Sequence, residues 1–128
     1  GDNYMVACGV PTADSDHAIK TVAMGIKMMA FVSSLPPMQG HRISMRIGVH
    51  SGSAVAGVIG KKKFVYDLWG DAVNTAGRME SHGLADEIHV SAVTAQLVRD
   101  AFDLKSRGLI EIKGIGSMET FFVQQAKN

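Results

Sequence analysis

The chain has 128 residues, of which 46% are hydrophobic and 20% are charged, and its formal net charge is +1. This length and composition predict one globular domain, and the near-neutral charge gives no electrostatic reason to expect a nucleic acid or a membrane surface as a partner. A single cysteine cannot form an internal disulfide, and no apolar stretch approaches the roughly 20 residues that a transmembrane helix needs.

The first half of the chain combines strands with one helix. Residues 3–10 (NYMVACGV) have the pattern of a buried strand. Apolar residues at three- and four-residue intervals then predict an amphipathic helix over residues 17–34, which Pro36 and Pro37 terminate. Alternating residues predict a strand over 43–49, and after an interruption the small residues 53–59 continue it.

The middle of the chain is predicted to form a hairpin. Residues 43–68 are typical of two strands that join at the basic turn Lys61-Lys62-Lys63. Asp71 is then a plausible N-cap for a helix, because its carboxylate can accept the free N–H groups of the first turn. The remaining elements are a strand at 87–90, a helix at 91–100 and an antiparallel pair at 109–113 and 120–124. This order predicts an α+β fold with one layer of helices on a mixed sheet.

Three polar residues around the Asp71 helix are candidates for ligand binding. Asn74 and Arg78 are four residues apart, so they lie side by side on one face of the helix. Asp67 is the one charged residue in the strand before the turn. A carboxylate, an amide and a guanidinium fork together suit recognition of a base and a phosphate. The alternative interpretation is a solvated helix face with no ligand.

Four motifs carry a resemblance to a known family. YDLWGDAVNTAGRMES resembles the signature of the class III nucleotidyl cyclases, which include adenylyl and guanylyl cyclases. GDNYMVACGVP, RIGVHSGSAVAGVIG and RGLIEIKGIG extend the resemblance over nearly the whole chain, in the order of the family. It implies a ferredoxin-like cyclase fold with a mainly antiparallel sheet. Residues 1–128 would be the C-terminal two-thirds of a single domain, without its first strand, two helices and a hairpin strand.

The resemblance also implies a divalent-metal site. Class III cyclases use two ions, Mg²⁺ or Mn²⁺, held by two aspartates, and Asp2 matches the second of these. The first metal aspartate and a base-selecting lysine of the adenylyl cyclases would lie upstream of residue 1. The histidines of the chain have no spacing typical of a zinc site.

The resemblance makes five further residues candidates for the substrate site. Asp67 matches the base selector and favours ATP, since a carboxylate can accept from the exocyclic amine of adenine but opposes the O6 acceptor of guanine. Asn74 and Arg78 match the pair that orients the ribose and stabilises charge on the α-phosphate, and Lys113 matches the phosphate-binding lysine. Three adjacent lysines are otherwise typical of a solvated turn, but with the resemblance Lys62 becomes a second candidate for contact with a phosphate. The family often has a second lysine where this chain has Ile115.

The sequence as a whole is therefore identified as a member of this family, most similar to an adenylyl cyclase that converts ATP to 3′,5′-cyclic AMP and pyrophosphate. Such domains work as dimers with sites at the subunit interface, and this chain matches both halves of a site, so a homodimer is expected. We expect it in the cytoplasm, where ATP is, without direct membrane contact. The alternatives are a guanylyl cyclase, or a catalytically silent module for dimerisation or nucleotide sensing.

Overall fold

The computed structural model describes residues 3–9, 12–53, 55–59 and 65–127. Three helices and a mixed sheet confirm the α+β class. None of the helices in these ranges is long and apolar enough to cross a lipid bilayer. The elements are, in chain order, α1 (His17–Ser34), β1 (Ile47–Val49), β2 (Val55–Ile59), β3 (Val65–Trp69), α2 (Asp71–Ser81), β4 (Ile88–Ser91), α3 (Ala92–Val98), β5 (Phe102–Ile112) and β6 (Gly116–Ala126).

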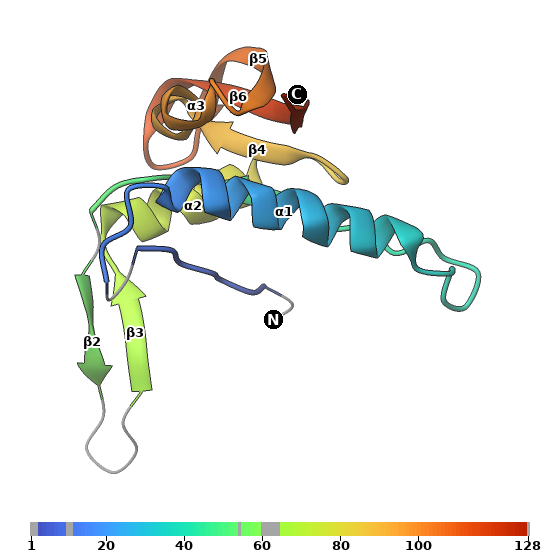
Figure 1. Cartoon of the computed structure of the whole chain (residues 1–128), viewed down its shortest axis with the longest axis horizontal. Helices are drawn as coiled ribbons and strands as arrows, with labels where there is room; N and C mark the ends of the chain where they lie inside the picture. Colours follow the sequence, from blue (N-terminus) through green and yellow to red (C-terminus); the bar gives the residue numbers. More distant parts are fainter. Residues whose placement is uncertain (1–2, 10–11, 54, 60–64, 128) are drawn as a thin grey trace.

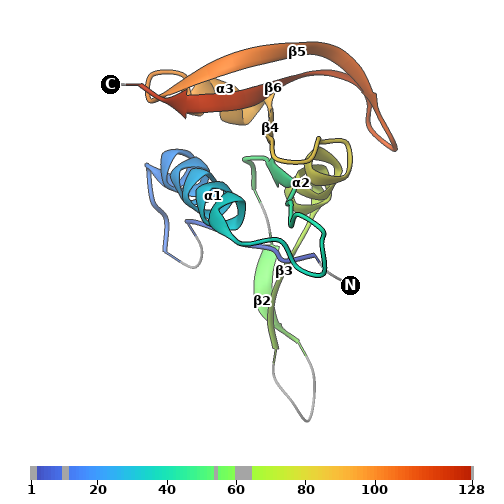
Figure 2. The ribbon, with the colours of Figure 1, turned by 90° about the vertical axis from the view of Figure 1, so that its right-hand side faces the viewer.

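Four strands form the main sheet, in the order β1-β4-β6-β5. Figure 1 shows β4 below the pair β5 and β6. β1 runs parallel to β4, and the other two pairs are antiparallel, so the sheet is mixed and mainly antiparallel as expected. β5 and β6 are 11 residues each, longer than the predicted pair. They form a long two-stranded arm above the helices (Figure 2).

The strand β4 is buried on both faces. Its Ile88 and Val90 pack into the core with α1 and α3, whereas His89 between them points to α2 on the opposite face. α1 and α2 accordingly lie on either side of the sheet (Figure 2). The expectation of a single helical layer was wrong, because the buried polar His89 conceals the second buried face of β4.

β1 and β2 follow each other in the chain but belong to different sheets. β2 and β3 form a separate antiparallel sheet, with Val55 opposite Trp69 and Ile59 opposite Val65, which confirms the hairpin. The predicted strand 43–49 keeps only its last three residues, and it does not lengthen the hairpin. The chain leaves strand geometry after Val49, and β1 pairs with β4 instead.

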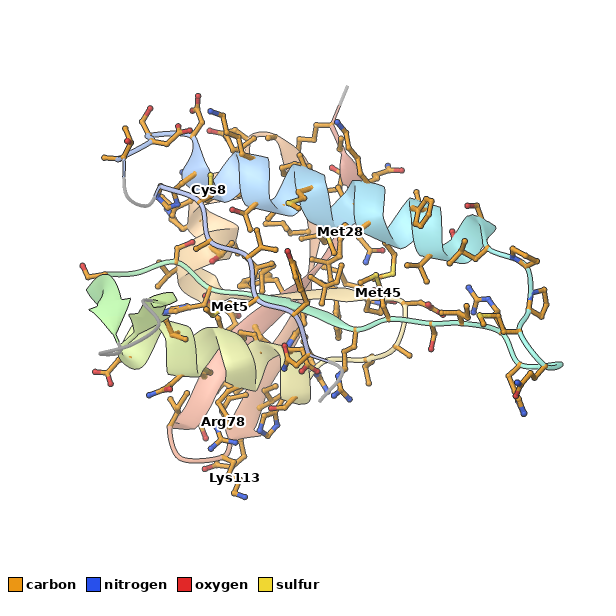
Figure 3. All side chains as sticks on the ribbon, turned by 90° about the horizontal axis from the view of Figure 1, so that it is seen from below. Met5, Cys8, Met28, Met45, Arg78 and Lys113 are labelled. Carbon is orange, nitrogen blue, oxygen red and sulfur yellow. The ribbon has the colours of Figure 1, made fainter. Side chains whose placement is uncertain are left out.

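The predicted strand at residues 3–10 is wrong over the residues that the structure describes. Residues 3–7 have no regular structure and are exposed, with Tyr4 82% and Met5 51% accessible. The segment passes between α1 and α2 (Figure 3) and pairs with none of the described strands. An apolar sequence alone does not make a strand, because strand geometry needs a partner for the backbone N–H and C=O groups.

Gly48 allows α2 to lie directly on β1. A Cβ atom at this position would stand 2.0 Å from the backbone nitrogen of Glu80 and 2.4 Å from the carbonyl carbon of Met79. The Met79 side chain is fully buried at this contact. The helix and the strand therefore touch backbone to backbone, a distance that only glycine permits.

His89 provides a second attachment of α2 to the sheet. Its Nδ1 lies 2.8 Å from the carbonyl oxygen of Met79, and its Nε2 lies 2.7 Å from Thr120 Oγ1. Because a carbonyl only accepts, Nδ1 carries the proton and Nε2 is the acceptor of a neutral ring. Burial lowers the pKa of His89 below its ordinary value of 6.5, and the nearby Arg107 acts in the same direction, whereas the bond to Met79 opposes them.

We predict that Gly48→Ala destabilises the domain by about 3 kcal/mol, since the added methyl group must separate α2 from β1. Gly77→Ala is the matched control, because a Cβ there meets no atom within 4 Å. Alanine in the helix interior should stabilise α2 by about 0.5–1 kcal/mol. Thermal unfolding of both variants measures the difference. Equal melting temperatures would contradict the close contact at Gly48.

We also predict that the free energy of unfolding decreases as the pH falls below about 6.5. The folded-state pKa of His89 is lowered, so the unfolded chain binds the proton first and stability is lost on acidification. His50, whose pKa burial also lowers, adds to this slope. Urea titrations between about pH 7.5 and 5.5 measure it, at no more than about 1.4 kcal/mol per pH unit for each histidine. His89→Gln should show a shallower slope, and an unchanged slope would contradict the assignment.

Candidate functional site

The helix α2 carries two of the predicted site residues. Gly70, with φ at 125°, occupies the N-cap position and makes the sharp turn after β3. Asp71, the predicted N-cap, is instead the first helical residue, where its carboxylate lies at the positive end of the helix dipole. Asn74 is exposed and Arg78 half-buried, one turn apart on the helix. Their spacing is as predicted, with both side chains on the same side of α2.

Lys113 comes from a different element, the turn between β5 and β6. The strand β5 ends at Ile112, whose carbonyl oxygen accepts the N–H of Ile115 at 3.0 Å. Gly114 and Gly116 have φ values of 80° and 111°, which favour glycine and close this tight turn. The turn leaves Lys113 exposed at the end of the β5–β6 arm.

Arg78 and Lys113 come together although 35 positions separate them in the sequence (113 minus 78). A Cβ atom on Gly114 would lie 3.9 Å from Arg78 Nη2, and Figure 3 places the two cationic side chains next to each other below α2. Among the side chains that the structure describes, neither forms an ion pair with a carboxylate. Two cations on separate elements, one of them a planar fork, suit the adjacent phosphates of one ligand.

The nearest described carboxylate on α2 is already engaged elsewhere. Glu80 Oε2 lies 2.5 Å from Arg46 Nε, and Glu80 Oε1 accepts from the amide of Asn3 at 3.1 Å. Glu80 thus holds the chain before β1 and the N-terminal segment against α2. Its charge is shared with Arg46, which leaves Arg78 available for an anionic ligand.

Three residues that connect Arg78 and Lys113 were missed from the sequence: His82, His89 and Arg107. The Nε2 atom of His82 accepts the backbone N–H of Lys113 at 3.2 Å. Arg107 Nη1 donates to the carbonyl oxygen of His82 at 2.5 Å and lies 3.3 Å from His89 Nε2. The one available signal was the position of Arg107 at the start of the RGLIEIKGIG motif, because the contacts join segments far apart in the chain.

The other predicted site residues are placed in part or not at all. Asp67 lies in β3, opposite Gly57 in the register of the hairpin and four positions before the start of α2. Its side chain falls outside the described structure. Asp2 and Lys62 also lie outside the described residues. The structure therefore brings Arg78 and Lys113 together, with Asn74 a turn away, and does not test the remaining three.

A hollow of about 420 Å³ lies between the N-terminal segment, α1 and the first half of α2. The described ionisable side chains that line it include Asp14 and His50. Asp14 forms an ion pair with Lys20, and His50 Nδ1 lies 2.6 Å from Ser91 Oγ. The Lys20 ammonium group, by its hydrogen bond, holds the pKa of the Asp14 carboxyl below its ordinary value. Asp14 and His50 therefore have partners within the protein and do not by themselves indicate a ligand.

A divalent ion such as Mg²⁺ is bound by oxygen ligands, mainly carboxylates, that gather at one point. Nowhere in the described ranges do three His, Cys, Asp or Glu side chains gather at a common point. The described residues therefore do not form a metal site by themselves. A site of the type that the resemblance implies would include Asp2, which lies outside the described residues.

Comparison with known proteins matches the chain to one family. Residues 1–125 match the family model described as the adenylate and guanylate cyclase catalytic domain. The chain is 42% identical to the guanylate cyclase soluble subunit beta-2 of Rattus norvegicus, over 100% of this chain and 19% of that protein. It is 39% identical to an adenylate cyclase of Mycobacterium tuberculosis, over 96% of this chain and 28% of that protein.

A solved structure gives the same result. The guanylate cyclase domain of RhGC from Catenaria anguillulae, determined in complex with GTP, matches with a TM-score of 0.89 and 37% identity. The match covers 94% of this chain and 66% of that one. The chain thus spans only part of the length of each relative. The matches include adenylate cyclases and guanylate cyclases, so they leave the choice between ATP and GTP open. The chain belongs to the adenylate and guanylate cyclase catalytic domain family.

Proposed function

We propose that this domain is an adenylate cyclase, which converts ATP to 3′,5′-cyclic AMP and pyrophosphate. In this reaction the ribose 3′ oxygen forms a bond to the α-phosphorus, the bond to the β-phosphate oxygen breaks, and the proton of the hydroxyl leaves to solvent. The observation that carries the proposal is the approach of Arg78 and Lys113 from two separate elements. The reaction that we assign to this pair of cations follows from the membership of the chain in the cyclase family.

The two cations have different tasks in this proposal. Arg78 is half-buried on a helix that is attached to the sheet, so its guanidinium is held in place to stabilise charge that develops on the α-phosphate. Lys113 is exposed on a turn and acts as a point charge for the departing phosphates, with Lys62 as a second candidate. Asn74, one turn before Arg78, would orient the ribose through its amide group.

The proposed preference for ATP depends on Asp67. A carboxylate in a closed pocket accepts the exocyclic N–H of adenine, and it meets the O6 acceptor of guanine with an unpaired charge. The strand β3 leads from Asp67 through Gly70 into α2, so the base would bind near the first turn of the helix and the phosphates near Arg78. Guanylate cyclase activity is the second candidate, favoured by the 42% identity to a guanylate cyclase subunit.

The proposal includes two divalent ions and a second subunit. Mg²⁺ or Mn²⁺, with Asp2 among the ligands, would lower the pKa of the 3′ hydroxyl and bind the pyrophosphate group when present. A homodimer would bring the Asp2 region of one subunit to the Arg78 and Lys113 region of its partner. We place the reaction in the cytoplasm, where ATP is available.

We predict that the full-length protein that carries this domain forms cyclic AMP from ATP with Mn²⁺. Arg78→Ala should lower the rate about 10²- to 10³-fold, because a positioned donor to the reacting phosphate is lost. Arg99→Ala removes the same charge from an exposed position beside α3 and should leave the rate unchanged. Product from both nucleotides is measured by chromatography at high protein concentration. Full activity of the Arg78→Ala variant would refute the site.

We also predict that Asp67→Cys lowers the ratio of kcat/KM for ATP to kcat/KM for GTP by at least about tenfold. The change removes the acceptor for adenine and the charge that opposes guanine. Asp100→Cys, at an exposed position after α3, is the matched control and should leave the ratio unchanged. If the ratio of the Asp67→Cys variant equals that of the wild type, the base is selected elsewhere.

A further inference from the structure

His82 makes contact with three parts of the candidate site. It follows the last residue of α2, and its backbone N–H donates to the carbonyl oxygen of Arg78 at 2.9 Å. Its own carbonyl oxygen accepts from Arg107 Nη1 at 2.5 Å. Its ring accepts the backbone N–H of Lys113 at 3.2 Å. His82 thus forms hydrogen bonds to the backbones of both Arg78 and Lys113. It also accepts a hydrogen bond from the side chain of Arg107 on β5.

The bond to Lys113 determines the state of the His82 ring. A backbone N–H can only donate, so Nε2 of His82 carries no proton and Nδ1 carries it. The bond fixes Lys113 at the first position of the β5–β6 turn. The same turn places Gly114 next to Arg78 Nη2. The position of the His82 ring therefore sets how closely Lys113 approaches Arg78.

Arg107 in turn holds His82 in place. Its guanidinium lies 5.3 Å from the centre of the Phe122 ring, stacked on it as a cation–π pair, and 3.3 Å from His89 Nε2. His89 is fully buried and bonded to Met79 on α2 and to Thr120 on β6. The end of α2 is in this way fixed to β4, β5 and β6 at once. Of the three network residues His82, His89 and Arg107, only His82 is bonded to Lys113 in the described chain.

The location of the bond argues against a purely stabilising role. The bond between Lys113 and His82 lies at an exposed position, where water could satisfy the same N–H group. An exchange of water for imidazole at the surface adds little to the free energy of folding. It does restrict the direction of the Lys113 backbone, and so the region that its side chain can reach.

From this geometry we propose that His82 is a positioning residue, which holds the Lys113 turn beside Arg78 so that both cations bind the phosphates of one nucleotide. The inference rests on the proposed function for the identity of the ligand. His82 itself touches no reacting atom in this account. It acts through Lys113, and a variant that lacks Lys113 should no longer respond to changes at His82.

A double-mutant cycle on the full-length protein tests the proposal, with pyrophosphate and Mg²⁺ as the probe and calorimetry as the measurement. His82→Ala should weaken pyrophosphate binding about three- to tenfold, the effect of one positioned hydrogen bond. Lys113→Ala should weaken it roughly 10- to 100-fold, as expected for a charge-assisted contact. The double variant should bind within about twofold of Lys113→Ala alone, because the two residues act in series.

Two further variants separate positioning from folding. His82→Gln keeps an acceptor close to the place of Nε2 and should bind pyrophosphate within about twofold of the wild type. The asparagine side chain of His82→Asn is too short to reach Lys113, so this variant should bind pyrophosphate as weakly as His82→Ala. It replaces His82→Ala in the cycle if the alanine variant does not fold. His41→Ala, at an exposed histidine away from α2, is the matched control. Melting temperatures are measured for all variants.

Three results would overturn the inference: additive losses in the double variant, equal binding by the His82→Gln and His82→Asn variants, or no binding of pyrophosphate to the wild type. A different result would overturn the proposed function alone. If pyrophosphate binds with the expected coupling but neither ATP nor GTP yields a cyclic product, His82 positions Lys113 for a phosphate ligand in a domain that does not catalyse cyclisation.

Discussion

The contact between α2 and β1 at Gly48 is the constraint on which the site depends. With no side chain at this position, the backbone of the helix rests on the backbone of the strand, at a separation that any Cβ would prevent. The site needs this closeness because Arg78 lies just before the contact residues Met79 and Glu80. A helix displaced outward by even the width of a methyl group would carry Arg78 away from the β5–β6 turn. Catalytic geometry tolerates little displacement of this kind.

Buried polar groups, in addition to apolar packing, complete the attachment of α2. In β4 the apolar Ile88 and Val90 face α1 and α3, while His89 bonds to the backbone of α2 and to Thr120. All ring nitrogens of His89 have partners, and the described chain contains no buried side-chain polar atom without one. A satisfied polar group of this kind fixes orientation as well as distance, which an apolar contact does not. The same residue links the core to Arg107 and hence to the edge of the site.

Local patterns predicted the elements of the structure, and non-local pairing decided the rest. The periodicity of residues 17–34 acts within a few positions, and the corresponding helix is found, as is the expected antiparallel pair near the C-terminus. Residues 3–9 have the composition of a strand but no described strand to pair with. The apolar pattern likewise could not reveal the second helical layer, because the residue that faces α2 from β4 is a histidine. Of the site, Asn74 and Arg78 followed from helical spacing, whereas the contacts of His82 depend on three separate segments.

In the proposed site, different residues would bind the phosphates and the base. This separation explains why family membership identifies the reaction but not the base. Arg78 and Lys113 would bind phosphates, which ATP and GTP share, so a phosphate site of this form is equally suited to either nucleotide. In the proposed site the base is distinguished by the few atoms of its hydrogen-bonding edge. In the proposed account, the difference between an adenylate and a guanylate cyclase then rests on Asp67, which precedes α2 in the sequence.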